Sequence, residues 1–485
     1  MNATLFGFHN SYARLPEHFF ARLSPTPVSD PRLVRINEDL AVRLKLDPAF
    51  LGSPEGVQIL AGNRVPGDAE PLAMAYAGFQ FGGWVPQLGD GRAILLGELA
   101  DRDGVRHDVQ LKGCGRTPFS RNGDGRAALG PMLREYIISE AIHALNIPTT
   151  RSLTVVKTGE TVMRETPLIG AILTRVAKSH IRVGTFQYAV ISDDKKNLKT
   201  LFDYTVDRHY PHIKDSKTPA LDLIKTVIEK QTKLVVDWMR VGFIHGVMNT
   251  DNMAISGETI DYGPCAFMDT YDPETVFSSI DQQGRYAYFN QPGIAKWNLA
   301  RLAESLIPLI DNDKDKAIKI ATETINSFAE LYKKNWFEMM RNKLGLQGED
   351  LKDEGLIIDL LTWMHQNKAD YTNTFCYLMN EKIKEDKIYS NQGFISWKQQ
   401  WQERLKLHNN SPEKSLKLMH SANPLVIPRN HKVEEALEAA NNDDLNPMKN
   451  LLKVLEKPYE NQKGISEYQS HAPASDKKYQ TFCGT

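Results

Sequence analysis

Cysteine is scarce in this chain, which has only four cysteines among 485 residues. They are Cys114, Cys265, Cys376 and Cys483, and no two of them form a C-x-x-C pair. Structural zinc sites and disulfide-stapled secreted domains need such pairs or a dense, even set of cysteines. The scarcity therefore argues against a zinc ribbon and a disulfide framework, and it predicts a reducing compartment.

Long apolar runs are also missing. A membrane-spanning helix needs about 20 consecutive apolar residues, and no stretch of this sequence approaches that length. The first residues, MNATLFGFHNSYARLPEHFF, alternate apolar with polar side chains and lack the continuous apolar core of a secretory signal. The sequence therefore predicts a cytoplasmic protein that does not enter a membrane.

A strong charge of either sign is absent as well, because the formal net charge is −1. Proteins that bind nucleic acid or anionic membranes usually carry a basic excess or a basic stripe. We therefore expect no nucleic-acid partner. Any anion-binding site must depend on a local cluster of cations.

What is present is an ordinary globular composition, with 41% hydrophobic and 25% charged residues and no visible internal repeat. A chain of this length can form two or three lobes around substantial cores. Changes in composition predict five regions: a Pro-rich extension wrapping the core (1–75), a β-rich lobe with one prominent helix (76–185), a helical lobe with the main motif (186–310), a helical region (311–455) and a mobile polar tail (456–485).

The main motif is FIHGVMNTDNMAISGETIDYG, residues 243–263. In a protein kinase the catalytic loop has a His, an Asp base two residues later, a metal-binding Asn and then an Asp-Phe-Gly whose Asp also binds metal. His245, Asn252 and Asp261 keep that order, but Val247 stands where the base is expected. A different carboxylate, Asp251, precedes the Asn. The motif therefore indicates either an inactive kinase relative or one with different chemistry.

Other parts of a kinase precede this motif in the expected order. Gly89-Asp90-Gly91 predicts a glycine-tipped hairpin, and the strand HDVQLKG carries Lys112. Apolar residues at four-residue spacing predict a helix over residues 131–145, which carries Glu135 away from its buried stripe. This position, together with the family resemblance given below, favours Glu135 as the partner of Lys112, and Glu140 on the same helix is a competitor. A second long helix is predicted over residues 221–239, directly before the motif.

Three longer segments resemble a known family: LKGCGRTPFSRNGDGRAALGPMLREYIISEA, LTRVAKSHIRVGTFQY and FIHGVMNTDNMAISGETIDYGPCAFMD. They are similar to selenoprotein O, a kinase-like family of protein adenylyltransferases. The resemblance covers nearly the whole chain. It implies an α+β, two-lobed kinase-like fold with terminal extensions, and it implies transfer of AMP from ATP to Ser, Thr or Tyr hydroxyls of other proteins.

The resemblance also implies roles for individual residues. ATP would lie in reverse orientation, with its β- and γ-phosphates deep in the site and its α-phosphate facing an acceptor hydroxyl near the base Asp251. Asn252 and Asp261 would bind Mg²⁺ or Mn²⁺, since both are hard oxygen donors. Asp124 is expected at the ribose or adenine. The implied nucleotide contacts are Gly89, Gly91, Arg92, Lys112, Asp124, Gly125, Arg175 and Arg182.

Two of these cations have a simple physical rationale, because the planar fork of Arg binds phosphate oxygens in pairs. Arg175 and Arg182 could equally be surface ion-pair partners, which is the commoner fate of an Arg. Two other functions also remain open at this stage: a pseudokinase scaffold that binds nucleotide without turnover, and a phosphotransferase that acts on a small molecule.

The resemblance finally draws attention to the cysteine near the C-terminus. Members of the family end with a redox-active residue, selenocysteine in some of them, and here Cys483 stands in that place. A disulfide between Cys483 and Cys265 would tie the tail across the segment that carries Asp261. The alternative is that Cys265 is a small buried apolar residue and Cys483 an idle thiol.

Overall fold

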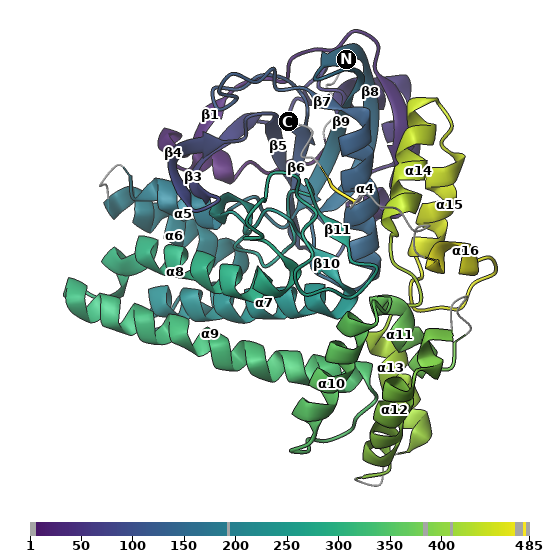
Figure 1. The fold of residues 1–485 in the computed structure, drawn as a ribbon. Coiled ribbons are helices and arrows are strands. Elements are labelled where there is room, and N and C mark those ends of the chain that lie inside the picture. The colour runs from purple at the N-terminus through teal and green to yellow at the C-terminus, as the bar shows by residue number, and fades with distance from the viewer. Residues whose placement is uncertain (1–5, 192–194, 382–386, 408–410, 471–478, 482–485) are drawn as a thin grey trace.

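A computed structural model describes residues 6–191, 195–381, 387–407, 411–470 and 479–481. It is a mixed α/β structure in which one antiparallel sheet packs against many helices (Figure 1). The strands of the large sheet are β1 (Phe20–Arg22), β2 (Arg32–Ile36), β3 (Leu72–Gln80), β4 (Gly83–Gly89), β5 (Ala93–Ala100), β6 (Arg106–Lys112), β7 (Ala127–Ala128), β8 (Arg151–Met163) and β9 (Pro167–Ala177).

The sheet has the order β1-β3-β5-β6-β9-β8-β2, while β4 pairs with β3 and β7 with β9. Its two outer strands on this path, β1 and β2, both come from the N-terminal part of the chain. β1 pairs with β3 and β2 pairs with β8. The N-terminal segment therefore supplies hydrogen-bonded edges to the sheet in addition to covering it.

The glycine-tipped hairpin predicted at residues 89–91 is wrong. β4 and β5, which flank this turn, both pair with β3 and not with each other. The tight hairpin instead joins β3 to β4, with Phe79 paired to Trp84 and the left-handed Gly82 at its tip. A glycine is favoured there because its backbone φ is +85°.

The helix predicted over residues 131–145 is present as α4 (Leu129–Ala144), which begins two residues earlier. Leu133, Ile137 and Ala141 are buried as the spacing indicated. Glu135 is buried too, at 1% exposure, although it lies outside that apolar stripe. A carboxylate so deeply buried requires a cationic partner, which the site below provides.

The second predicted helix is also confirmed, within α7 (Pro219–Val241). It ends at Gly242, whose φ of +73° is the left-handed conformation that commonly terminates helices. The chain then enters the short strand β10 (Phe243–Ile244), which pairs with β11 (Ala266–Phe267). This pairing brings the two ends of the main motif together and closes it into a loop.

Most of the other helices form a layer on one side of the sheet and an extension below it (Figure 1). α8 and α9 pack on α7, whereas α14 and α15 return to lie against α4. The remaining bounds are α1 (Glu38–Arg43), α2 (Pro48–Gly52), α3 (Pro54–Leu60), α5 (Val183–Ala189), α6 (Lys195–His209), α8 (Gln291–Ile310), α9 (Lys314–Lys343), α10 (Asp353–Gln366), α11 (Tyr371–Leu378), α12 (Gln392–Leu405), α13 (Pro412–Ala422), α14 (Asn430–Asn441), α15 (Asn446–Leu455) and α16 (Ser466–Gln469).

The described part of the predicted mobile tail is docked on the body of the protein. Thr481 donates its backbone N–H to Phe277 O at 2.8 Å and its hydroxyl to Pro264 O at 2.7 Å. Tyr479 accepts a hydrogen bond from Arg134 of α4 at 2.7 Å. These contacts place the last described residues next to the segment that carries Asp261.

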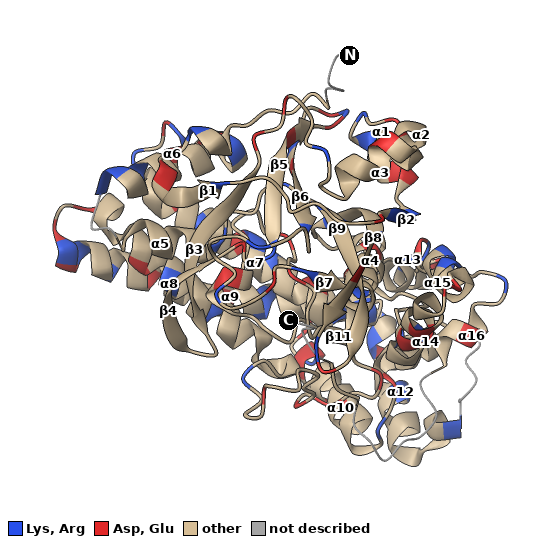
Figure 2. Cartoon of the chain, turned by 90° about the horizontal axis from the view of Figure 1, so that it is seen from above, with Lys and Arg blue, Asp and Glu red and all other residues tan. Residues whose placement is uncertain are grey.

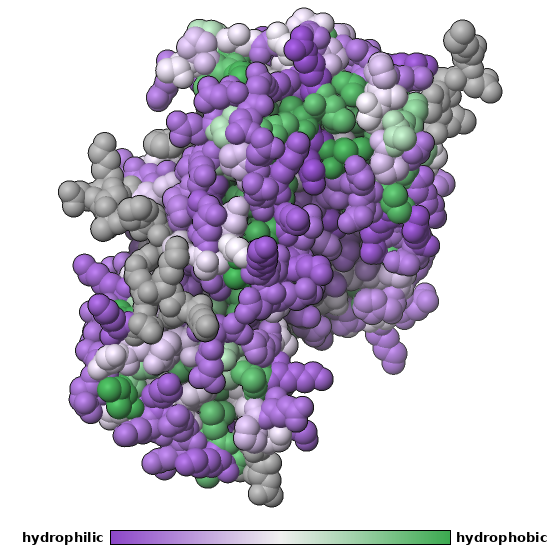
Figure 3. Space-filling view, turned by 90° about the vertical axis from the view of Figure 1, so that its right-hand side faces the viewer, coloured by the Kyte–Doolittle hydropathy of each residue, from purple (hydrophilic) through white to green (hydrophobic). Residues whose placement is uncertain are grey.

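The surface carries charges of both signs. Figure 2 shows Lys and Arg interspersed with Asp and Glu on outer helices such as α6. The face that carries α14 and α15 is mainly hydrophilic, with hydrophobic residues in small groups (Figure 3). Among the described helices, none has the length and apolar character needed to cross a bilayer.

Candidate active site

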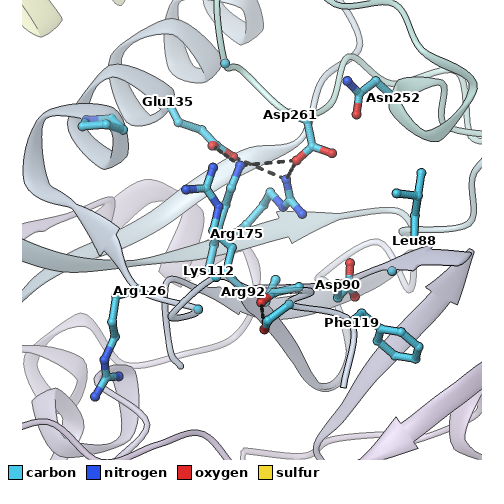
Figure 4. A pocket seen from close by; sticks show the side chains of 18 of the residues that line it. Leu88, Asp90, Arg92, Lys112, Phe119, Arg126, Glu135, Arg175, Asn252 and Asp261 are labelled. Carbon is cyan, nitrogen blue, oxygen red and sulfur yellow. Dashed lines mark hydrogen bonds and ion pairs between the residues drawn. The ribbon is translucent and has the colours of Figure 1, made fainter. Parts of the chain in front are cut away.

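A cavity of about 300 Å³ lies between the sheet, α4 and the main motif. Its lining includes every residue that the resemblance assigned to nucleotide or metal, together with Glu135 (Figure 4). These residues are Gly89, Gly91, Arg92, Lys112, Asp124, Gly125, Glu135, Arg175, Arg182, Asn252 and Asp261. Asp251 and Cys265 do not line it. Residues from opposite ends of the sequence segment 89–261 therefore meet in one cleft.

Strand register positions two of the cations. Lys112 ends β6, and Arg175 lies on the neighbouring strand β9, paired with Gln110 of β6. The Gln110 side-chain oxygen accepts a hydrogen bond from Arg175 Nη2 at 2.5 Å, which holds the guanidinium on the same face as Lys112. Arg182 is the residue directly before α5, and its side chain enters the cleft from there.

All three cations contact Asp261. Lys112 Nζ lies 3.3 Å from Oδ1, while Arg175 Nη1 pairs with Oδ1 and Arg182 Nη1 with Oδ2. Arg175 and Arg182 are among the most deeply buried side chains of the described chain. Such burial excludes the surface ion-pair interpretation of these two arginines.

The pKa of Asp261 reflects this environment. Burial alone would raise it, but the positive charges of Arg182, Arg175 and Lys112 lower it well below the usual value. Asp261 also has a φ of +61°, a conformation that non-glycine residues adopt uncommonly and that is often associated with functional sites. The carboxylate is therefore ionised and held in one orientation.

Glu135 rather than Glu140 contacts Lys112. Glu135 Oε2 accepts a hydrogen bond from Lys112 Nζ at 2.6 Å, and its other oxygen lies 3.5 Å from Arg175. Glu140 pairs instead with Arg151 at 2.6 Å. Arg182 also lies 4.0 Å from Asp90, so the three cations face three carboxylates, Glu135, Asp261 and Asp90. The cleft as a whole is net positive, because its lining has seven Lys or Arg side chains and four Asp or Glu.

The Asn252 side chain is oriented by Val247, the residue at the position where a kinase has its base. Its Nδ2 donates to the backbone oxygen of Val247 at 3.0 Å, and this bond directs the amide. His245 is fully buried, and its Nε2 lies 2.8 Å from Ile260 O, a contact that joins two parts of the main motif. Burial lowers the pKa of His245, so the ring is neutral and structural.

Asp251 lies beside the cavity, 8% exposed, in a short 3₁₀ turn (Thr250–Asn252). Its backbone oxygen accepts a hydrogen bond from Arg182 at 2.5 Å, which joins it to the cation cluster. Burial raises the pKa of the Asp251 carboxyl to about 6, although Arg182 lowers it in part. Oδ1 has no hydrogen-bond partner among the described residues and packs against Gly78 of β3.

The glycines of the cleft have a structural reason that the sequence did not reveal. A side chain at Gly89 would overlap the ring of Phe119, and one at Gly91 would lie 2.9 Å from the Phe119 backbone oxygen. Gly125 has a φ of +70°, and a Cβ there would overlap Gly115. Close packing of the protein itself therefore requires these glycines, independently of any ligand.

Asp124 is paired with Arg164 of the β8–β9 connection, at 2.8 and 3.1 Å. Hydrogen bonding from Arg164 lowers the pKa of Asp124. Arg164 itself lines the cavity and also donates to Arg126 O. The pair explains how a carboxylate can stand at the rim of a cleft lined mainly by cationic side chains.

The sequence-based prediction left out several residues that line this cleft, among them Tyr76, Asp90 and Arg164, and it also left out Gln110, which supports the cleft from β6. Arg182 stacks on the Tyr76 ring with 4.8 Å between guanidinium carbon and centroid. Asp90 accepts from Gln110 Nε2 at 2.9 Å and from the backbone of Met74 at 3.2 Å, and burial raises its pKa to about 6. The only available signal was a carboxylate inside the Gly-Asp-Gly turn.

Cys265 is fully buried behind this site, and its backbone oxygen accepts a hydrogen bond from Arg134 at 3.3 Å. Its suggested partner Cys483 lies outside the described residues. The disulfide between them stays a prediction.

A buried, net positive cleft that also presents an amide and a carboxylate oxygen is typical of enzymes that use a nucleoside triphosphate. The sequence matches the family model described as "Protein adenylyltransferase SelO" over residues 3–456. The chain therefore belongs to the SelO family, as its motifs indicated.

Three relatives illustrate how close this membership is, and each carries the name "Protein nucleotidyltransferase YdiU". The Pelagibacter ubique protein is 59% identical over 99% of both chains. The Bacillus cytotoxicus protein is 57% identical over 99% of this chain and 98% of its own. The Anoxybacillus flavithermus protein is 57% identical over the full length of both.

Proposed function

We propose that this protein is an adenylyltransferase that moves AMP from ATP to Ser, Thr or Tyr hydroxyls of target proteins and releases diphosphate. The observation that carries the proposal is the convergence of Lys112, Arg175 and Arg182 on Asp261 in one buried cleft. Family membership and the names of the relatives support the same activity.

A kinase-like, two-lobed architecture is part of the proposal. The sheet and α4 would form the small lobe, with proposed bounds 76–185, and the helices around α7 the large lobe, with bounds 186–310. Residues 1–75, 311–455 and 456–485 would be the N-terminal extension, a helical region and a tail. The position of the cleft between the sheet and the main motif supports this arrangement.

The cations would bind the β- and γ-phosphates. They face three carboxylates, Asp261, Glu135 and Asp90, but the cleft lining as a whole carries more Lys and Arg than Asp and Glu. Phosphate oxygens satisfy the excess, because Arg forks and a Lys ammonium both donate to them. Reverse orientation of ATP then leaves the α-phosphate toward Asn252 and the acceptor.

Asn252 and Asp261 would hold Mg²⁺, or Mn²⁺, with phosphate and water oxygens completing the shell. Both side chains fit a hard cation, since the Asn252 nitrogen is engaged by Val247 and its oxygen remains to accept a metal. A bound metal supplies charge neutralisation at the phosphates and orients them. Phosphate binding would also draw the arginines from Asp261 and release its oxygens for the metal.

Asp251 would act as the general base. The acceptor hydroxyl oxygen forms a bond to the α-phosphorus, the bond from that phosphorus to the oxygen bridging to the β-phosphate breaks, and diphosphate leaves. The hydroxyl proton passes to Asp251. A pKa of about 6 suits this role, because the carboxylate is largely ionised at neutral pH yet is basic enough to accept a proton.

Two ATP samples labelled separately at the α- and γ-phosphate test the proposal. Incorporation of the α-label into protein, with none from γ, is the expected result. Incorporation of the γ-label would identify a kinase or small-molecule phosphotransferase. Binding of ATP without incorporation of either label would identify a pseudokinase scaffold.

A further inference from the structure

A partly exposed group of aromatic and arginine side chains lies beside residues 249–251 of the main motif, outside the nucleotide cavity. It joins the β3–β4 hairpin to α8 and to the segment before α8. We call it the aromatic–arginine surface, and its members are Phe79, Phe81, Trp84, Arg285, Trp297 and Arg301.

Three aromatic rings of this surface pack in contact, with Phe79 between Trp84 and Trp297 in tilted and edge-on arrangements. The centroids of Phe79 and Trp84 lie 4.9 Å apart, and those of Phe79 and Trp297 5.1 Å apart. The guanidinium carbons of Arg285 and Arg301 lie 5.1 and 4.8 Å from the Trp297 centroid. Arg stacked in this way keeps the edges of its fork available for hydrogen bonds.

Backbone hydrogen bonds connect the surface directly to the catalytic loop. Phe79 N donates to Thr250 Oγ1 at 2.8 Å, and Phe81 N donates to Asn249 Oδ1 at 3.0 Å. These two acceptors immediately precede Asp251, which packs against Gly78 of the same strand. A molecule that rests on this surface therefore has its neighbouring residues beside the proposed base.

Two large aromatic side chains of this surface are exposed to solvent. Trp84 is 43% and Phe81 37% exposed, and β4, which carries Trp84, pairs only with β3 among the described strands. Large aromatic residues and arginine are the side chains that contribute most at protein interfaces. Exposed apolar groups next to a site commonly mark binding surfaces.

The positive charge of this surface indicates what kind of partner it binds. Arg285 forms no ion pair among the described residues; its side chain hydrogen-bonds Tyr286, and its Nε is buried there without a partner. Within the described part of the chain, Arg301 forms one ion pair, with Glu304, whose side chain is 58% exposed. Two guanidinium groups beside exposed rings are complementary to a segment that combines an apolar side chain with carboxylates.

We infer that the aromatic–arginine surface docks the acceptor protein, and that it selects hydroxyls flanked by an apolar residue and by Asp or Glu. The inference rests on the proposed function, because it assigns the second substrate of the same reaction. It adds a specificity that neither the motifs nor the nucleotide cavity contain.

Two synthetic peptides test this selection. Both carry the same Ser, Thr and Tyr acceptors and one Trp, and they differ only in having Glu or Lys as flanking residues. Transfer from α-labelled ATP should favour the Glu peptide by about tenfold in kcat/KM, which corresponds to about 1.4 kcal/mol. Arg285→Glu should remove or reverse this preference, whereas Arg285→Lys should retain it in part.

Matched variants on a distant helix separate docking from general damage. Lys398 of α12 stacks on Tyr377 at 4.8 Å as Arg285 stacks on Trp297, and Ile395 of α12 is 39% exposed. Lys398→Glu and Ile395→Ala should leave peptide preference unchanged. Trp84→Ala should raise KM for both peptides several-fold and leave the affinity for ATP, measured by calorimetry, as in the wild type.

The outcomes are distinguishable. Equal use of both peptides by the wild type, or a preference untouched by Arg285→Glu, overturns the docking inference and leaves the adenylyltransferase intact. Binding of the fluorescent Glu peptide without transfer of AMP to any acceptor overturns the proposed function alone. If Trp84→Ala dissociates a dimer in sedimentation experiments without changing peptide KM, the surface joins copies of this chain and the inference is wrong.

Discussion

The cation cluster and the loop of the main motif each hold one aspartate, and the pKa values of the two carboxyls are shifted in opposite directions. Asp261 is surrounded by Lys112, Arg175 and Arg182, and its pKa is lowered well below the usual value. Asp251, only ten positions earlier in the sequence, has its pKa raised to about 6 because desolvation dominates. Burial alone does not set a pKa; the number of cations that face the group decides its direction.

The opposite pKa shifts favour different chemical roles for Asp261 and Asp251. A carboxylate with a very low pKa stays ionised and suits a metal ion, whereas one with a pKa near neutrality can exchange a proton. The substitutions below test these roles, beginning with the largest expected effect.

Asp251→Ala should reduce AMP transfer by about 10²- to 10⁴-fold, the usual cost of losing a general base. Binding of ATP and Mg²⁺, measured by calorimetry, should remain close to wild type, because Asp251 does not line the cavity. Asp251→Asn is the matched control for shape and should be equally inactive. Transfer at the wild-type rate would remove Asp251 from this role.

Asp261→Asn should act on binding rather than on proton transfer. Losing the carboxylate removes a proposed metal ligand and leaves Lys112 and Arg175 with Glu135, and Arg182 with Asp90. We expect affinity for ATP in excess Mg²⁺ to fall by about 10- to 100-fold, the range seen when metal-site residues are lost. Undiminished binding in the calorimeter would contradict the metal assignment.

Alanine substitution of Lys112, Arg175 or Arg182, one at a time, should weaken ATP binding more than AMP binding. AMP lacks the β- and γ-phosphates that these cations are proposed to hold. Loss of one charge-assisted contact corresponds to about tenfold in affinity for ATP. Equal losses for both nucleotides would argue against the reversed orientation.

The pH dependence of kcat/KM gives a smaller but more specific effect. Because the Asp251 carboxyl has a pKa raised to about 6, activity should increase as pH rises through about 6 and the base becomes ionised. Asp90 in the same cleft has a similar pKa, so Asp90→Asn is the necessary control. The acid limb should persist in that variant if Asp251 is responsible.

The smallest effect is expected from substitution of Arg164, at the rim of the cleft. Arg164→Ala should raise KM for ATP by a few-fold and leave kcat near wild type, since Arg164 orients Asp124 and does not reach Asp261. Arg164→Lys, which keeps one of the two contacts, should be intermediate. A fall in kcat without a change in KM would indicate that Asp124 has a role in the chemical step.

Local patterns were sufficient for much of this protein. Apolar spacing predicted α4 and the long helix α7, and the order of motif residues predicted the family and the set of side chains that line the cleft. These predictions succeed because helix periodicity and loop motifs depend on residues that are near in sequence. The predicted hairpin at residues 89–91 failed because β4 and β5 both pair with β3, and strand pairing depends on distant residues.

The sequence by itself thus determined the helices that position the site and the residue types in it. Only the tertiary structure decided that Glu135 and not Glu140 holds Lys112, that Arg175 and Arg182 turn inward to Asp261, and that Phe119 requires glycine at positions 89 and 91. Each of these depends on which strands are neighbours and on what space remains between them. Strand neighbours and the space between them are determined by residues far apart in the sequence, and a local sequence pattern does not contain this information.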